Sequence, residues 1–143
     1  MSMRFKYRTE LRPDGIERKG PWIPIIIRGK SETVELIFLL DSGADYTVLP
    51  IEIAEILRLD LSAPPEKTQG VGGEVDTINT TAEILIKKGH EQYRFRVPVG
   101  VIAEKKSKIP PLLGRAGFFE EFDITIKERA GVVILKKLNP IPY

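Results

Sequence analysis

Short runs of alternating or wholly apolar residues, separated by glycine and proline, recur along the whole chain. Runs of this kind predict short β-strands rather than long helices. The stretch 50–59 differs, because its apolar residues recur at helical spacing behind Pro50, and it predicts a helix. A further helical turn is expected at 116–122. The runs that predict strands are 5–9, 22–27, 32–40, 78–87, 92–101, 111–115, 123–127 and 131–138.

These elements predict a mostly β protein, a small closed or sandwiched β-barrel with one or two short helices. The 143 residues are enough for one domain with a core of its own. Pro24 is expected near an edge or at the start of its strand, because proline cannot donate a ladder hydrogen bond. Turns are expected at Pro13-Asp14-Gly15 and at Gly89.

Composition and charge exclude several classes of partner. The net charge is +2, from 22 basic and 20 acidic side chains, and Lys105, Lys106 and Lys108 make only one short cluster, which is interpreted as a solvated loop. A nucleic-acid partner is therefore not expected, because such binding needs a concentrated basic face. The first six residues lack the apolar segment of a signal peptide, and no apolar run approaches a membrane span. A cytoplasmic location without membrane contact is the expectation.

The residue types leave carboxylates as the candidate acid–base groups. The chain has no cysteine, which removes disulfides, thiol catalysis and cysteine-ligated metals. Its single histidine, His90, lies in a stretch typical of a hairpin tip, where a surface position is the expected interpretation.

The apolar run from Ile37 to Leu40 leads directly into Asp41, which Ser42 and Gly43 follow. Burying an ionised carboxylate is costly unless it is paired or hydrogen-bonded, so this strand end suggests either a reactive group or an aspartate that caps its own turn. A carboxylate dyad that shares one proton can act as both base and acid. The Asp-Ser-Gly stretch occurs once, so a dyad would need a second copy across a two-fold axis.

Two further stretches are ambiguous alone. The stretch Gly70-Val71-Gly72-Gly73 fits a plain hairpin tip, or a mobile flap over a cleft, better than a phosphate loop, because it lacks the Lys-Ser/Thr of that motif. Leu112-Leu113-Gly114-Arg115 fits ordinary core before a tight turn, although its arginine is able to bind a carboxylate such as Asp45 in a bidentate manner.

The order of the three stretches resembles that of the retropepsins, the single-domain aspartic proteases of retroviruses and their cellular and prokaryotic relatives. The segment 40–50, with Asp-Ser-Gly-Ala-Asp and then Thr-Val-Leu, is close to the active-site loop of that family. The resemblance extends from about Pro24 to Ile126. It implies a closed β-barrel of the acid-protease (retropepsin) type.

The resemblance implies a role for each residue of the loop. Asp41 corresponds to the catalytic aspartate, one from each subunit of a homodimer. Ser42 is expected to hydrogen-bond across the dimer axis, and Gly43 to lie along the substrate backbone. Asp45 is expected to bind the substrate main chain and to pair with Arg115.

The resemblance also implies that the substrate is a peptide or protein in extended conformation, cleaved without metal or cofactor. Gly70 to Glu74 would form the flap, and the leucines before Arg115 would pack behind the catalytic loop. The residues expected to bind substrate are Ala44, Asp45, Gly70, Val71, Gly72 and Gly73. Those expected to support the loop are Leu112, Leu113, Gly114 and Arg115.

Within a single domain 1–143, the division expected is an extension at 1–23, a family-like core at 24–126, and a C-terminal strand and tail at 127–143. The extension is interpreted as an added hairpin, a dimerisation arm or a segment that covers the cleft. The expected function is an aspartic endopeptidase. The alternative is a non-catalytic peptide-binding or scaffold module that retains the acid-protease fold.

Overall fold

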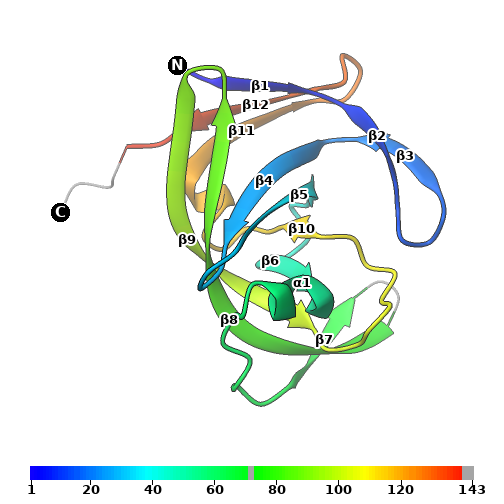
Figure 1. Ribbon diagram of the computed structural model, residues 1–143. Helices are drawn as coiled ribbons and strands as arrows, with labels where there is room; N and C mark the ends of the chain where they lie inside the picture. The colour runs from blue at the N-terminus through cyan, green and yellow to red at the C-terminus, as the bar shows by residue number, and fades with distance from the viewer. Residues whose placement is uncertain (71–72, 140–143) are drawn as a thin grey trace.

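The computed structural model describes residues 1–70 and 73–139 and is a closed β-barrel with a second, smaller sheet beside it (Figure 1). The mostly β barrel with short helices predicted from the sequence is confirmed. The helices are α1 (Ile51–Ile56) and the 3₁₀ turn η1 (Phe119–Glu121). The strands are β1 (Met3–Lys6), β2 (Arg8–Leu11), β3 (Glu17–Gly20), β4 (Trp22–Arg28), β5 (Thr33–Leu40), β6 (Thr47–Pro50), β7 (Glu66–Gly70), β8 (Gly73–Lys88), β9 (Glu91–Ile102), β10 (Leu112–Leu113), β11 (Phe122–Lys127) and β12 (Val132–Lys137).

Six strands in the order β4-β5-β10-β6-β9-β8 form the barrel, which the pairing of β4 with β8 closes. The short strand β10 lies between β5, to which it is parallel, and β6, to which it is antiparallel. Strand β7 belongs to the same sheet but pairs only with β8, so it extends outside this ring. Closure leaves the barrel strands without free edges except where neighbouring strands differ in length.

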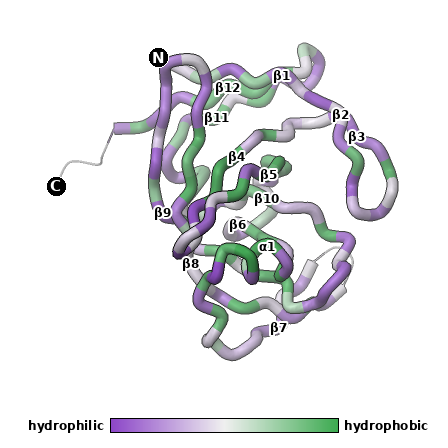
Figure 2. Tube along the Cα trace, in the orientation of Figure 1, coloured by the Kyte–Doolittle hydropathy of each residue, from purple (hydrophilic) through white to green (hydrophobic). Residues whose placement is uncertain are grey.

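The alternation of apolar residues fills the barrel. In β4, Ile23, Ile25 and Ile27 are fully buried, while the residues between them are partly exposed, as the two-residue period of a strand requires. The core is one continuous cluster that also includes Phe38 and Phe118. Figure 2 shows β4 as largely hydrophobic and the outlying β7 as hydrophilic.

Strand β4 has two neighbours along only part of its length. It pairs with β5 from Trp22 to Arg28, but with β8 only from Ile26 to Arg28. Pro24 therefore lies where the strand has one neighbour. The prediction that it occupies a strand start or edge is confirmed.

The two ends of the chain form a separate three-stranded sheet in the order β1-β12-β11. The predicted strand 5–9 is divided at Tyr7, whose N–H donates to the carbonyl of Gly131 at 2.7 Å, and the chain then leaves this sheet for β2. The predicted strands at 123–127 and 131–138 are present as β11 and β12. The predicted tail from 140 to 143 lies outside the described residues.

The helix predicted over 50–59 is shorter than expected. It begins behind Pro50 and ends at Ile56, because Leu57 and Arg58 close the turn and Arg58 has a φ of 54°. A residue with positive φ cannot continue a right-handed helix. The predicted turn at 116–122 contains η1, as expected. In the described part of the chain, no helix is both long and apolar enough to cross a lipid bilayer.

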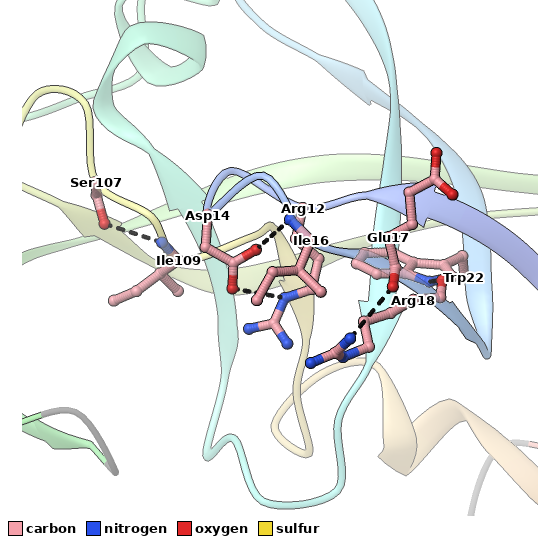
Figure 3. Close-up of polar contacts among 8 residues, drawn as sticks. All are labelled: Arg12, Asp14, Ile16, Glu17, Arg18, Trp22, Ser107 and Ile109. Atoms are coloured by element: carbon pink, nitrogen blue, oxygen red, sulfur yellow. Dashed lines mark hydrogen bonds and ion pairs between the residues drawn. The ribbon is translucent and has the colours of Figure 1, made fainter.

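Strands β2 and β3 form a two-stranded hairpin that extends from the barrel (Figures 1 and 3). At its tip the Asp14 carboxylate accepts the N–H of Ile16 at 3.0 Å, and Gly15 adopts a φ of 84°, so the predicted turn is present. At its base the indole N–H of Trp22 donates to the Arg18 carbonyl at 3.1 Å. Residues 8–20, within the predicted extension, are thus an added hairpin.

Candidate active site

Asp41 follows the last residue of β5 and emerges from the core at the end of that strand. Leu40, the residue before it, is 5% exposed, whereas Asp41 itself is partly exposed. Its N–H donates to the carbonyl of Leu113 at 3.0 Å, so the parallel strand β10 fixes where the chain turns. Asp41 is therefore held by the barrel at its backbone, while the residue as a whole stays partly exposed.

The turn after Asp41 is organised by the aspartate. Its Oδ1 accepts the N–H of Gly43 at 2.8 Å, and its carbonyl accepts the N–H of Ala44 at 3.1 Å. A Cβ on Gly43 would lie 3.1 Å from Oδ1, closer than a side chain normally packs. The carboxylate thus caps its own turn, which is one of the two interpretations that the sequence left open for an aspartate at this strand end. Within the described residues, its second oxygen Oδ2 has no hydrogen-bond partner, which leaves it available for chemistry.

The expected ion pair between Arg115 and Asp45 is present. The side chains are 60% and 75% exposed, so the pair contributes at most about 1 kcal/mol to stability. The backbone holds the two segments together more firmly. The N–H of Arg115 donates to the carbonyl of Ala44 at 2.9 Å, and the N–H of Ala116 donates to the carbonyl of Asp45 at 2.8 Å.

A close contact between Gly114 and Tyr46 sets the distance between these segments. A Cβ on Gly114 would lie 2.3 Å from the backbone carbonyl of Tyr46. On its other side, the Tyr46 ring covers Gly100 of β9, where an added Cβ would lie 2.3 Å from the ring carbon Cε2. Both glycines therefore allow Tyr46 to be clamped between β9 and the 112–115 segment.

Gly114→Ala is expected to destabilise the protein by about 1–3 kcal/mol. The new methyl group would clash with the backbone of Tyr46, which cannot move aside as a flexible side chain could. Chemical denaturation of the two proteins measures the difference. Gly20→Ala is the matched control, since a Cβ there meets its nearest atom at an ordinary 3.6 Å. Equal stability of the Gly114→Ala and Gly20→Ala proteins would contradict the role given to this contact.

The β7–β8 hairpin carries the two described glycines of the glycine-rich stretch, and it lies below β5 in Figure 1. Gly70 pairs with Gly73, and Val71 and Gly72, also expected at the site, lie outside the described residues. Two contacts join β7 to β8 at the base of this hairpin. The hydroxyl groups of Thr68 and Thr77 form a hydrogen bond of 2.7 Å, and Lys67 Nζ lies 2.9 Å from Asp76 Oδ1. Bonding to Asp76 raises the pKa of Lys67.

The structure brings most of the predicted site residues together. Residues 41–45 and 112–115 form one unit, in which Leu113 is fully buried, while Ser42 is exposed and Gly70 and Gly73 belong to the separate hairpin. The sequence interpretation missed Tyr46 and Gly100. The signal for Gly100 is a glycine inside an otherwise apolar strand, which often marks a close approach. Within residues 1–70 and 73–139, no group of three or more acidic or histidine side chains is arranged to hold a metal ion.

Comparisons with known proteins identify a family for the chain. The family model described as "Aspartyl protease" matches residues 23–116, which include Asp41, Gly70 to Gly73 and Arg115. A search of curated protein sequences finds no significant match. Among solved structures, a retropepsin-like aspartic protease from Rickettsia conorii is similar at a TM-score of 0.58 and 19% identity, over 94% of this chain and 90% of that chain.

A second similar structure is that of EIAV protease complexed with the inhibitor HBY-793. It is 30% identical over 68% of this chain and 84% of that chain, with a TM-score of 0.47. The Rickettsia structure shows that the fold is retropepsin-like, and the family model covers well over half of the chain. The chain therefore belongs to the aspartyl protease family.

Proposed function

We propose that the protein is an aspartic endopeptidase whose catalytic dyad consists of Asp41 from each of two identical chains. The observation that carries this proposal is the state of Asp41: a partly exposed aspartate whose backbone strand β10 fixes by a hydrogen bond. Acid–base catalysis requires a side chain whose backbone is fixed in position and whose reactive oxygen is free to exchange a proton.

The proposed reaction uses the two carboxylates and one water molecule. With one proton shared between them, the ionised Asp41 takes a proton from water as the water oxygen attacks the peptide carbonyl. The protonated Asp41 of the other chain donates to the carbonyl oxygen. Collapse of the tetrahedral intermediate breaks the C–N bond, and a proton passes to the leaving nitrogen. Neither metal nor cofactor takes part in these steps.

The neighbouring residues are assigned supporting roles in the same proposal. Ser42, exposed beside the aspartate, would hydrogen-bond to the partner loop across the two-fold axis. Gly43 leaves room for the substrate backbone, and Asp45, oriented by Arg115, would bind the substrate main chain. The β7–β8 hairpin would close over an extended peptide by strand-like bonding.

The proposed dimer does not depend on exchanged termini. In retroviral relatives a sheet woven from both chains provides much of the contact, whereas here β1 pairs with β12 of the same chain. The contacts between subunits are therefore assigned to the active-site loops.

The test is cleavage of a diverse peptide library over a range of protein concentrations, with the oligomeric state measured by sedimentation. The rate per chain is expected to fall on dilution in step with the dimer fraction, because a single chain supplies one Asp41 only. Constant specific activity from a proven monomer would contradict the shared dyad. Peptide binding without cleavage by a proven dimer would instead support a non-catalytic module.

A further inference from the structure

A groove of about 680 Å³ lies between the terminal sheet and the barrel. One of its lining residues, Trp22, pairs with Leu39 of β5, two residues before Asp41, and Asp41 itself is not part of the lining. In Figure 1 the groove corresponds to the region between β1 and β4, near the end of β8. Three segments distant in sequence meet there. The residues that line it are Arg4, Phe5, Lys6, Tyr7, Arg8, Trp22, Pro24, Lys87 and Lys88.

The lining has five cationic side chains and no acidic one, although the whole chain is nearly neutral. Within the described residues, Arg8 pairs with Glu10 at 2.7 Å, and the other four cations have no carboxylate within 4.0 Å. Lys88 Nζ lies 5.3 Å from the centre of the Phe5 ring, a cation–π contact that positions it. Several cations in one groove, largely without partners, favour an anionic ligand.

Two further acidic side chains approach the groove. Glu128 accepts the Tyr7 hydroxyl at 2.8 Å, and Glu91, opposite Lys88 in the β8–β9 hairpin, accepts the Tyr93 hydroxyl at 2.6 Å. Burial and the bond to Glu128 raise the pKa of Tyr7, so it presents a neutral ring to the groove. Neither carboxylate forms an ion pair with a lining cation among the described residues, so the groove keeps an excess of positive charge.

Two of the strands that contribute residues to the groove have an edge without a strand partner. β1 is the outer strand of its sheet and pairs only with β12, which leaves its other edge without a strand partner in the described part of the chain. Strand β4 from Trp22 to Ile25 has no neighbour on the side where β8 joins further along. Open strand edges bind extended peptides by adding a strand.

The aromatic residues distinguish a peptide from a nucleic acid. Single-stranded nucleic acids bind basic grooves through bases stacked on exposed aromatic rings. Here Phe5 is 5% exposed and Trp22 is 4% exposed, so neither ring is available as a stacking platform. Of the aromatic residues that line the groove, Tyr7 alone is partly exposed, and one ring does not provide the successive platforms on which a single strand stacks its bases. The other exposed elements of the groove are cations and backbone.

We propose that this groove binds an acidic polypeptide segment in extended conformation, which pairs with the free edge of β1 and places its carboxylates against Arg4 and Lys6, while Lys87 and Lys88 add to the positive charge nearby. Arg4 and Lys6 lie two residues apart on β1 and so share one face, matching a ligand with acidic residues at alternate positions. The groove is a binding site additional to the proposed cleavage site and does not depend on it.

The test measures fluorescence anisotropy of a labelled Glu-Val-Glu-Val-Glu-Val-Glu peptide with the full chain carrying Asp41→Asn, so that cleavage cannot intervene. Saturable binding is expected. The double reversal Arg4→Glu/Lys6→Glu should weaken it by about tenfold or more, because like charges then face each other. Lys106→Glu/Lys108→Glu is the matched control, with the same change of net charge on an exposed loop, and should bind as the parent does.

A second probe separates strand pairing from simple charge attraction. The same peptide with all of its internal amide nitrogens methylated keeps its carboxylates but loses every N–H donor that a strand pairing would use, and it should bind about tenfold more weakly. Equal binding of the methylated peptide would overturn the strand-addition geometry. Equal weakening by both double reversals, absence of binding by the acidic peptide, or tighter binding of an oligothymidylate that displaces it would overturn the proposed ligand.

Discussion

Asp41→Asn is expected to lower peptide cleavage by about 1,000-fold or more while leaving the fold intact. Asparagine has nearly the same shape, and its Oδ1 can still accept the Gly43 N–H that orders the turn. It cannot accept a proton from water or supply one to the substrate. The dyad would therefore lose both its base and its acid.

Asp123→Asn provides the control for this experiment. Asp123 is an exposed aspartate on β11, away from the loop, so its replacement should leave cleavage unchanged. Thermal unfolding and the peptide-cleavage rate are measured for both variants. Residual cleavage at the parent rate by a stable Asp41→Asn protein would refute the proposed mechanism.

Phe118→Ala is expected to destabilise the fold by about 3–5 kcal/mol. Phe118 is fully buried, and its ring centre lies 5.2 Å from that of Phe122 and 6.1 Å from that of Phe95. The large cavity left by truncation would be lined by these rings. Because Phe118 follows the turn that carries Gly114 and Arg115, its loss should also loosen the support of the catalytic loop.

Phe119→Ala is the matched comparison, since the adjacent ring is only partly buried. It should cost clearly less free energy of unfolding in a urea titration. If the two truncations had equal effects, Phe118 would not be the anchor that its burial indicates. For a Phe118→Ala protein that remains folded, the cleavage rate per folded dimer is the measure of loop support.

Local patterns in the sequence accounted for most of the barrel and for the loop at Asp41. Strand periodicity identified β4, β5, β8 and β9, because each has a buried face that repeats every second residue. The end of the helix was misjudged, because the left-handed position that closes it is occupied by Arg58 and not by the glycine that usually signals such an end. The cap is shown by two local hydrogen bonds, from the N–H of Arg58 to the Glu55 carbonyl and from the N–H of Leu59 to the Ala54 carbonyl.

Features made by residues far apart in sequence were not predictable in the same way. The pairing of β1 with β12 joins the two ends of the chain, and no local pattern encodes that choice. The basic groove has the same origin, because Arg4 and Lys88 are unremarkable surface residues until the fold places their strands together. The contact of Tyr46 with Gly100 and Gly114 likewise appears only after three segments have packed.

The terminal sheet has a consequence for the kinetics of assembly. Since β1, β12 and β11 are joined within one chain, each subunit can complete its fold in a first-order process, without waiting for a partner to supply a strand. Association is then a separate second-order step, whose extent is set by mass action. In the proposed protease, newly made chains would accumulate as folded, inactive monomers, and the onset of activity would depend on concentration rather than on folding.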